Sequence, residues 1–453
     1  KDIFEDSIAG ISLEKAYREF RLDSKKSDTV IVAVLDMRFH INHPDLKGFI
    51  WKNIGEIPNN EIDDDYNGYI DDVHGWNFLG NKRGQQAYRA NFEYVRIIRK
   101  YDSIFKNKNI DSINPKDSIK YKMYIDALKE YDAEKKYVLR RLRVLKYEKV
   151  KKNFLEQELS KMFPNKELTI EELSEINTED ELVEKRIKTL INYKKDSLKN
   201  EQNIALENRY LDIYLNIDFN ERQIIGDNVD DITDTSYGNN IVLADNSENS
   251  HTHGIKVAGI IGADRNNNIG IKGITNRVKI MPVAISPYGD EQDKDIALGI
   301  RYAVNNGANI INISSSKSFS LNKKWVIEAI QYAEKNDVLV ITSAGNEAKN
   351  LDVSQNYPND TNEDNTEIVQ NFLKVGATSY DAGENIIHYT SNYGKQSVDI
   401  FAPGREIFTT QSNNSYGYNS GTSYSAPIVS GIAALIRSYY PNLTAAEVKQ
   451  IIM

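Results

Sequence analysis

Asp36, His253 and Ser423 are the residue types that together can activate a hydroxyl group as a nucleophile. A serine hydroxyl attacks well only when a base removes its proton, and neutral imidazole does this near neutral pH. A buried carboxylate holds the imidazole in the required tautomer and stabilises the imidazolium that forms. The chain order Asp, His, Ser is one of several that build this geometry on unrelated folds. We therefore predict a catalytic serine, with Asn346 as an amide donor to the oxyanion.

The segments around these residues indicate how they are positioned. A continuous apolar run, Thr29–Leu35, predicts a buried strand that delivers Asp36 at its carboxyl end. Helical patterns separate three more strand-like runs, at residues 278–285, 309–314 and 338–343. This alternation predicts an α/β fold with a mostly parallel central sheet and helices on both faces. Ligands of such sheets bind beyond the carboxyl ends of the strands, where Asp36 is expected.

Composition excludes several classes of protein. Of the 453 residues, 40% are hydrophobic, which is enough for a sizeable core. The net charge of −9 argues against a nucleic-acid-binding protein, which would normally carry a basic surface. The chain has no cysteine, so disulfides and thiolate metal sites are excluded. No apolar run approaches the roughly 18–20 residues of a membrane span. The opening KDIFEDSIAG has no signal peptide, and the closing LTAAEVKQIIM stops within a helical pattern. We expect a trimmed chain, cut within its last helix.

Composition also divides the chain into three parts. Residues 1–84 and 216–453 carry the α/β pattern, and in residues 85–215 Lys, Glu, Tyr and Leu dominate while glycine nearly vanishes. We expect this middle part to be a charged α-helical insertion, with capping boxes at Thr169–Glu172 and Thr178–Glu181. A solvated helical arm and a partner-binding or regulatory arm are both open interpretations of it.

Four motifs in a fixed order give the chain a definite resemblance. They are Asp36 with His43-Pro-Asp-Leu46, His253-Gly with Val257-Ala-Gly259, Ala344-Gly-Asn346, and Gly421-Thr-Ser423 with Ala426-Pro427. With these motifs the chain resembles the subtilisin-like serine proteases, or subtilases, of peptidase family S8. The resemblance covers roughly residues 8–80 and 217–453, and the helical insertion is similar to that of Bacteroidetes-type subtilases. It implies a three-layer, doubly wound subtilisin-like sandwich.

The resemblance also implies an activity and a way of binding substrate. It implies an endopeptidase with an Asp-His-Ser triad, secreted or displayed at the bacterial cell surface and made with a propeptide. An extended peptide would add as a strand beside Ser314, Ser315 and Ser316. Ser343, Ala344 and Gly345 would form the opposite wall of the primary specificity pocket.

Two acidic segments predict structural calcium. The spacing Asp63-Asp-Asp65-Tyr-Asn67-Gly68 matches the first six positions of an EF-hand loop. His74 stands where that loop would place its closing Glu, so Asp71 or Asp72 would have to close the cage. An acidic surface loop is the alternative. The resemblance implies a second calcium site, which includes Asp45 and Asn267.

Several residues near the predicted site depart from the subtilase pattern. Met37 and Arg38 replace a small hydroxyl residue and a glycine after Asp36, Lys256 replaces a histidine, and Tyr424 replaces a methionine. Ser316 replaces a glycine beside the substrate. These changes leave two functions open: a working but divergent endopeptidase, and a pseudoprotease scaffold that binds peptides or a partner. Ser423→Ala distinguishes the two functions, because it should abolish peptidase activity and leave the binding of a peptide or partner intact.

Overall fold

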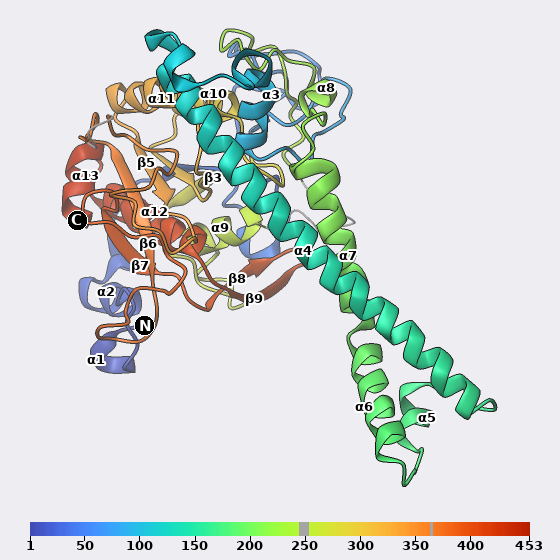
Figure 1. Cartoon of the computed structure of the whole chain (residues 1–453). Helices are drawn as coiled ribbons and strands as arrows, with labels where there is room; N and C mark the ends of the chain where they lie inside the picture. Colours follow the sequence, from blue (N-terminus) through green and yellow to red (C-terminus); the bar gives the residue numbers. More distant parts are fainter. Residues whose placement is uncertain (244–252, 363–365) are drawn as a thin grey trace. The chain divides into compact units, whose positions relative to one another are not determined.

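The protein consists of two compact units. The computed structural model describes residues 1–243, 253–362 and 366–453 (Figure 1). One unit, here the α/β unit, combines Lys1–Glu93 with Glu221–Met453, and the other, here the helical unit, is Tyr94–Asn220. The helical unit thus lies between Asp36 and His253 in the sequence, where an insertion was expected at residues 85–215.

A seven-stranded sheet forms the centre of the α/β unit, with every neighbouring pair of strands parallel. Its strand order is β2-β3-β1-β4-β5-β6-β7. The strands are β1 (Val30–Asp36), β2 (Trp76–Asn77), β3 (Val278–Ala284), β4 (Ile310–Ile313), β5 (Leu339–Ser343), β6 (Phe372–Thr378) and β7 (Ile400–Pro403). A separate antiparallel pair follows, β8 (Ile407–Gln411) and β9 (Ser415–Asn419). The predicted α/β fold with a mostly parallel sheet is confirmed.

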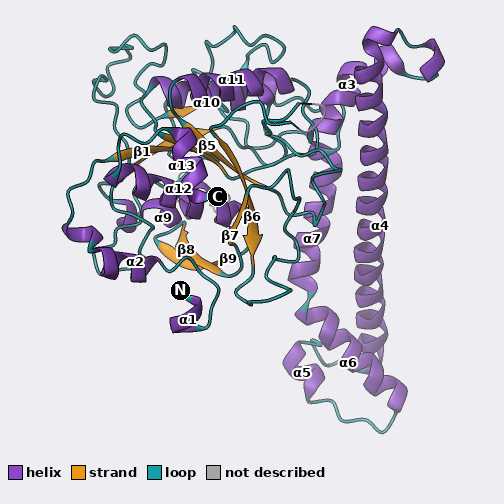
Figure 2. Ribbon diagram, turned by 90° about the vertical axis from the view of Figure 1, so that its left-hand side faces the viewer, coloured by secondary structure: helices purple, strands orange, loops and turns teal. Residues whose placement is uncertain are grey.

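Helices cover both faces of the sheet (Figure 2). Val32 and Val34 of β1 pack into one hydrophobic cluster, and Ala33 and Leu35 pack into the other, because successive strand side chains point to opposite faces. The first cluster includes residues of α9 (His253–Gly262), α12 (Thr422–Tyr439) and α13 (Ala445–Ile452), and the second includes residues of α10 (Asp293–Asn305) and α11 (Lys323–Lys335). Burying each large aliphatic side chain contributes about 1.5–3 kcal/mol, so the two clusters stabilise the packing of the helices on the sheet.

The helical unit is built around one long helix. Its helices are α3 (beginning at Glu93 and ending at Phe105), α4 (Ser118–Met162), α5 (Ile170–Ser174), α6 (Glu181–Lys195) and α7 (Ser197–Arg209), followed by a π-helical turn at Tyr210–Tyr214. The 45 residues of α4 contain neither glycine nor proline, and the helix ends just before Pro164. At 1.5 Å per residue α4 is about 67 Å long. Within this unit it packs against α6 and α7 (Figure 2).

Two caps in the helical unit can be compared with the sequence. Thr169 caps α5 as expected, since its hydroxyl accepts a hydrogen bond from the Glu172 N–H at 3.2 Å. The capping box predicted at Thr178 is wrong. α6 is capped by Asp180, whose carboxylate accepts from the N–H groups of Leu182 and Val183. Aspartate is as good an N-cap as threonine, and Asp180 lies immediately before the first helical residue.

Candidate active site

Asp36 and His253 meet at the carboxyl end of β1. The Nδ1 atom of His253 lies 2.9 and 2.8 Å from the two carboxylate oxygens of Asp36. Since an ionised carboxylate can only accept, Nδ1 must carry the proton, which leaves Nε2 of the neutral ring as a proton acceptor. The Asp36 side chain is 3% exposed and that of His253 is 28% exposed. The carboxylate is thus shielded from water while the imidazole can still reach a ligand.

The surroundings of His253 act on its pKa in opposite directions. Burial of the ring lowers the pKa, and the charge and hydrogen bond of Asp36 raise it, with the net result that the pKa lies above its usual value. Lys256 opposes the rise and Glu291 adds to it. A raised pKa makes the imidazole a stronger proton acceptor.

Ser423 lies in the first turn of α12, where backbone N–H groups have no acceptor within the helix. Its hydroxyl donates a hydrogen bond to the carbonyl oxygen of Ser314 at 2.9 Å. No hydrogen bond joins Ser423 to His253 in the part of the chain that the structure describes, so the serine hydroxyl would have to turn away from Ser314 before it could give a proton to the imidazole. Such contacts are often made only once substrate is bound.

Asn346 is held with its amide in one orientation. Its Oδ1 accepts hydrogen bonds from the N–H of Thr422 at 2.9 Å and from the Thr422 hydroxyl at 3.3 Å. The same hydroxyl accepts from the N–H of Gly345 at 3.1 Å. Because both contacts occupy the oxygen, the Nδ2 group remains as the donor that this side chain can offer to an oxyanion. Thr422 thus orients Asn346, a role that the sequence did not suggest.

Met37 and Arg38 are accommodated without disturbing Asp36. The backbone N–H of Met37 donates to the Asp36 carboxylate at 2.7 Å, so the carboxylate has a hydrogen-bond donor at this position although the Met37 side chain offers none. Arg38 turns to Leu243 and Tyr88: Nη1 donates to the Leu243 carbonyl oxygen at 2.8 Å, and the guanidinium lies 5.4 Å from the Tyr88 ring centroid. Neither residue has a positive φ, so the turn carries no left-handed strain.

Tyr424 packs near His253, and Lys256 acts on it through its charge. The ring of Tyr424 is buried, with its centroid 5.8 Å from that of His253 and the two planes tilted by 50°. Burial, together with the charge of Asp36, raises the pKa of Tyr424 to about 12, so the phenol stays neutral. Burial lowers the pKa of Lys256, and Asp36 opposes that effect.

The predicted catalytic residues share one open cleft. It is lined by Asp36, Met37, His253, Ser286, Pro287, Tyr288, Gly289, Glu291, Ser314, Ser315, Ser316, Ser343, Asn346, Glu347 and Ser423. Of the predicted substrate-binding residues, the three serines 314–316 and Ser343 lie in this wall. Ala344 and Gly345 are buried and are not among the lining residues. Lys317 is directed elsewhere: its ammonium lies 2.8 Å from the Asp293 carboxylate.

The Subtilase family model matches residues 27–453. The chain belongs to the subtilase family. Subtilisin-like protease 1 of Plasmodium berghei (strain Anka) is 32% identical over 256 residues, which are 53% of this chain and 42% of the relative. The cell wall-associated protease of Bacillus subtilis (strain 168) is 33% identical over 48% of this chain and 23% of its own length. The thermophilic serine proteinase of Bacillus sp. (strain AK1) is 34% identical over 42% and 44%. The matched region therefore spans less than half of these relatives.

Carboxylates gather at a second place in this subtilase, beside the predicted calcium loop. Oxygens of Glu56, Asp65 and Asp72 lie within 4.8 Å of one another. Burial raises the pKa of Glu56, and it raises that of Asp72 to about 6. Asn53 bridges the cluster, since its Nδ2 donates to Asp65 at 2.9 Å and to Asp72 at 2.7 Å. Closely spaced carboxylate oxygens form a donor set that fits Ca²⁺.

The other predicted loop ligands have different partners. Asp63 accepts from the N–H groups of Asn67 and Gly68, and Asp71 accepts from those of Asn60 and Glu61. Asn67 directs its Nδ2 at Asp65 and Asp72, and its Oδ1 accepts from the N–H of Tyr69. These three side chains shape the loop around the carboxylate cluster. Glu56 was missed because it lies seven residues before the D-x-D-x-N-G pattern.

The structure also brings Asp45 and Asn267 together. The buried Asp45 carboxylate accepts from Asn267 Nδ2 at 2.7 Å and from the Ile271 N–H at 3.0 Å. Burial, together with a hydrogen bond to this carboxylate, raises the pKa of the Tyr416 hydroxyl to about 12. Asn267 thus directs its Nδ2 at Asp45. To bind a cation here, the side-chain amide would have to rotate so that its oxygen faces the ion.

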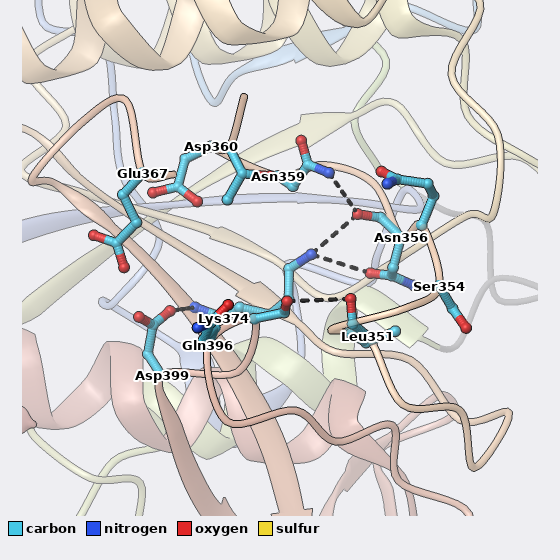
Figure 3. Close-up of a pocket in the computed structure, with 12 residues that line it drawn as sticks. Leu351, Ser354, Asn356, Asn359, Asp360, Glu367, Lys374, Gln396 and Asp399 are labelled. Atoms are coloured by element: carbon cyan, nitrogen blue, oxygen red, sulfur yellow. Dashed lines mark hydrogen bonds between the residues drawn. The ribbon is translucent and has the colours of Figure 1, made fainter. Parts of the chain in front are cut away.

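A polar pocket lies between the first half of β6 and the loop around residue 356 (Figure 3). Lys374 Nζ donates to the carbonyl oxygen and the side-chain oxygen of Asn356, at 3.1 and 3.3 Å. Burial lowers the pKa of Lys374 to about 8 and raises that of Asp360 to about 7. Lys449 of α13 lies 2.9 Å from Glu367 and 3.7 Å from Asp399. The acidic pocket therefore contains its own cations.

Proposed function

We propose that this subtilase is a serine endopeptidase in which Ser423 is the nucleophile, His253 the general base and Asp36 its orienting carboxylate. One observation carries the proposal: Nδ1 of His253 is hydrogen-bonded to the Asp36 carboxylate at 2.8 Å, in a cleft that Ser423 and Asn346 also line. His253 Nε2 takes the hydroxyl proton as the Ser423 oxygen attacks the peptide carbonyl carbon, and the Asn346 amide binds the oxyanion. The imidazolium then protonates the leaving amine, and water hydrolyses the acyl-enzyme.

The substrate would bind as an extended strand. The main chain of Lys317 already exchanges hydrogen bonds with Tyr357, at 2.9 and 2.8 Å. An added peptide would pair in the same way with the neighbouring residues Ser314–Ser316, next to the nucleophile.

The family implies protein substrates and a propeptide, and we extend both to this chain. We also infer export to the cell surface or medium, a location that the name of the Bacillus subtilis relative supports. None of the helices among the described residues is long and apolar enough to cross a membrane.

Covalent labelling with a fluorophosphonate probe tests the proposal. The expected result is one modified peptide, containing Ser423, which is absent from a Ser423→Ala variant of equal stability. An isosteric Asp36→Asn variant should label far more slowly, because the imidazole then adopts the wrong tautomer. A folded protein that fails to label would contradict the proposal and favour a peptide-binding scaffold.

We further propose that the cluster of Glu56, Asp65 and Asp72 binds a structural Ca²⁺. Bound calcium would neutralise carboxylates whose charged forms burial disfavours. A ligand at one hundred times its Kd stabilises a protein by about 2.7 kcal/mol, so chelation should lower the melting temperature. Asp72→Asn should remove this dependence on calcium, whereas Asp63→Asn should keep it, since Asp63 binds backbone N–H groups. Equal behaviour of the two variants would contradict the assignment.

A further inference from the structure

The helix α4 has two faces with different partners. Val138, Leu142 and Leu159 are buried on the side that packs within the helical unit. Six residues at positions i, i+3, i+4, i+7, i+11 and i+14 follow the opposite side: Arg140, Arg143, Val144, Tyr147, Lys151 and Phe154. Residues at this spacing lie on one face of a helix. We call these six residues the exposed stripe, and they extend over about 21 Å.

Large apolar groups in the exposed stripe are open to solvent. Val144 is 52% exposed, Tyr147 is 60% exposed and Phe154 is 55% exposed. Lys151 lies over the Tyr147 ring, with its ammonium 5.3 Å from the centroid. Scattered exposed apolar residues need no explanation, but a continuous line of them beside basic groups is typical of an interaction surface.

Charge distinguishes the exposed stripe from the packed side of the same helix. On the packed side, Arg141 pairs with Glu207 at 3.1 Å and Lys149 pairs with Glu201 at 3.4 Å. Arg140, Arg143 and Lys151 form no ion pair with any residue in the described ranges. From residue 135 to 152 the chain has nine Lys or Arg and a single acidic residue, Glu148, although its overall charge is −9.

We propose that the exposed stripe of α4 binds an acidic segment of another polypeptide that also carries apolar side chains. Three unpaired cations supply the electrostatic complement, and the aromatic rings supply apolar anchors. Arginine and tyrosine are enriched at protein–protein hot spots, which favours a polypeptide over a lipid surface. The acidic character of the chain as a whole opposes a nucleic acid. This surface would act in addition to the cleft and is independent of the proposed catalytic chemistry.

The binding test uses the full chain with Ser423→Ala, so that the probe is not cleaved. The probe is a fluorescein-labelled 20-residue peptide with the repeat Glu-Glu-Leu-Phe-Glu, followed by fluorescence anisotropy. We expect saturable binding that weakens with salt, and a loss of at least about tenfold in affinity when Arg140, Arg143 and Lys151 are all changed to Glu. Tyr147→Ser with Phe154→Ser should also weaken binding.

Two controls keep the result interpretable. Lys185→Glu, Lys195→Glu and Lys199→Glu make the same charge change at exposed positions of α6 and α7, and should change affinity less than about twofold. Arg140→Lys with Arg143→Lys retains the charge and should retain most of the binding. Equal affinity of the stripe variant and the control variant would overturn the proposal. So would tighter binding to vesicles containing phosphatidylserine, or to a 20-nucleotide DNA, than to the peptide.

Discussion

The two units of this subtilase differ in what their charged residues do. In the α/β unit, several charged groups are buried and paired: Asp36 with His253, Lys317 with Asp293, and Lys294 with Asp227 at 2.8 Å. In the helical unit, most charged groups remain in water, and many of them lie along the long helix α4. Burial thus fixes the positions of charged side chains in the α/β unit, and exposure leaves those of the helical unit in contact with water. Variants in each unit should therefore fail in different ways.

The largest effect is expected at Asn346, the proposed oxyanion donor. Asn346→Ala should lower kcat by about 10²–10³ with little change in KM, a magnitude measured on subtilisin itself. Asn346→Asp retains an oxygen that can accept from Thr422 but has no Nδ2 donor. It should therefore lower kcat by at least as much. Steady-state kinetics on a peptide substrate measures both. If Asn346→Asp remained fully active, Asn346 would serve in packing rather than as a donor.

A core truncation tests whether the units are separate. Leu159→Ala removes a fully buried side chain from the cluster it forms with Leu168, Leu173, Ile187 and Leu190, and should destabilise the helical unit by about 2–5 kcal/mol. We expect faster amide hydrogen exchange in residues 118–195 and unchanged labelling of Ser423. Ile341→Ala, in the buried strand β5, should instead lower labelling on heating. Loss of labelling in Leu159→Ala would show that the units are coupled.

A smaller effect is expected in the pH dependence of catalysis. The proposed base, His253, must be neutral to accept a proton, so activity should be present above its pKa and be lost as the pH falls through it. Lys256 opposes the raised pKa of His253, so Lys256→Met should move this acidic limb to higher pH and lower kcat/KM below neutrality by less than about tenfold. Lys26→Met, at an exposed position, is the matched control. A shift to lower pH would contradict the sign.

The smallest effect is expected at a cap. Thr169→Ala should destabilise α5 by about 0.5–2 kcal/mol, because the Glu172 N–H loses its acceptor. Thr169→Ser should restore most of this stability. Local hydrogen exchange measures the difference, and peptidase activity should not change in either variant.

Sequence patterns predicted what depends on local spacing. The strands, the order of the motifs and the position of Asp36 at the end of β1 follow from apolar runs and small neighbouring residues. The residues that Arg38 and Asn346 contact could not be predicted, because Leu243 and Thr422 are 205 and 76 residues away in the sequence. Glu56 joins the carboxylate cluster through folding of a loop that has no periodic pattern. Thr178 failed as a cap because a better-placed acceptor, Asp180, follows it two residues later.

The hydrogen bond from the Met37 backbone to Asp36 has a consequence for evolution. Every amino acid except proline has this N–H group, so the side chain at position 37 can change without depriving the Asp36 carboxylate of its donor. Divergent members of the family should not be classed as inactive because of the side chain after their aspartate. Only proline at position 37 would remove the donor altogether, and a census of natural variants at this position would reveal whether selection avoids that one residue.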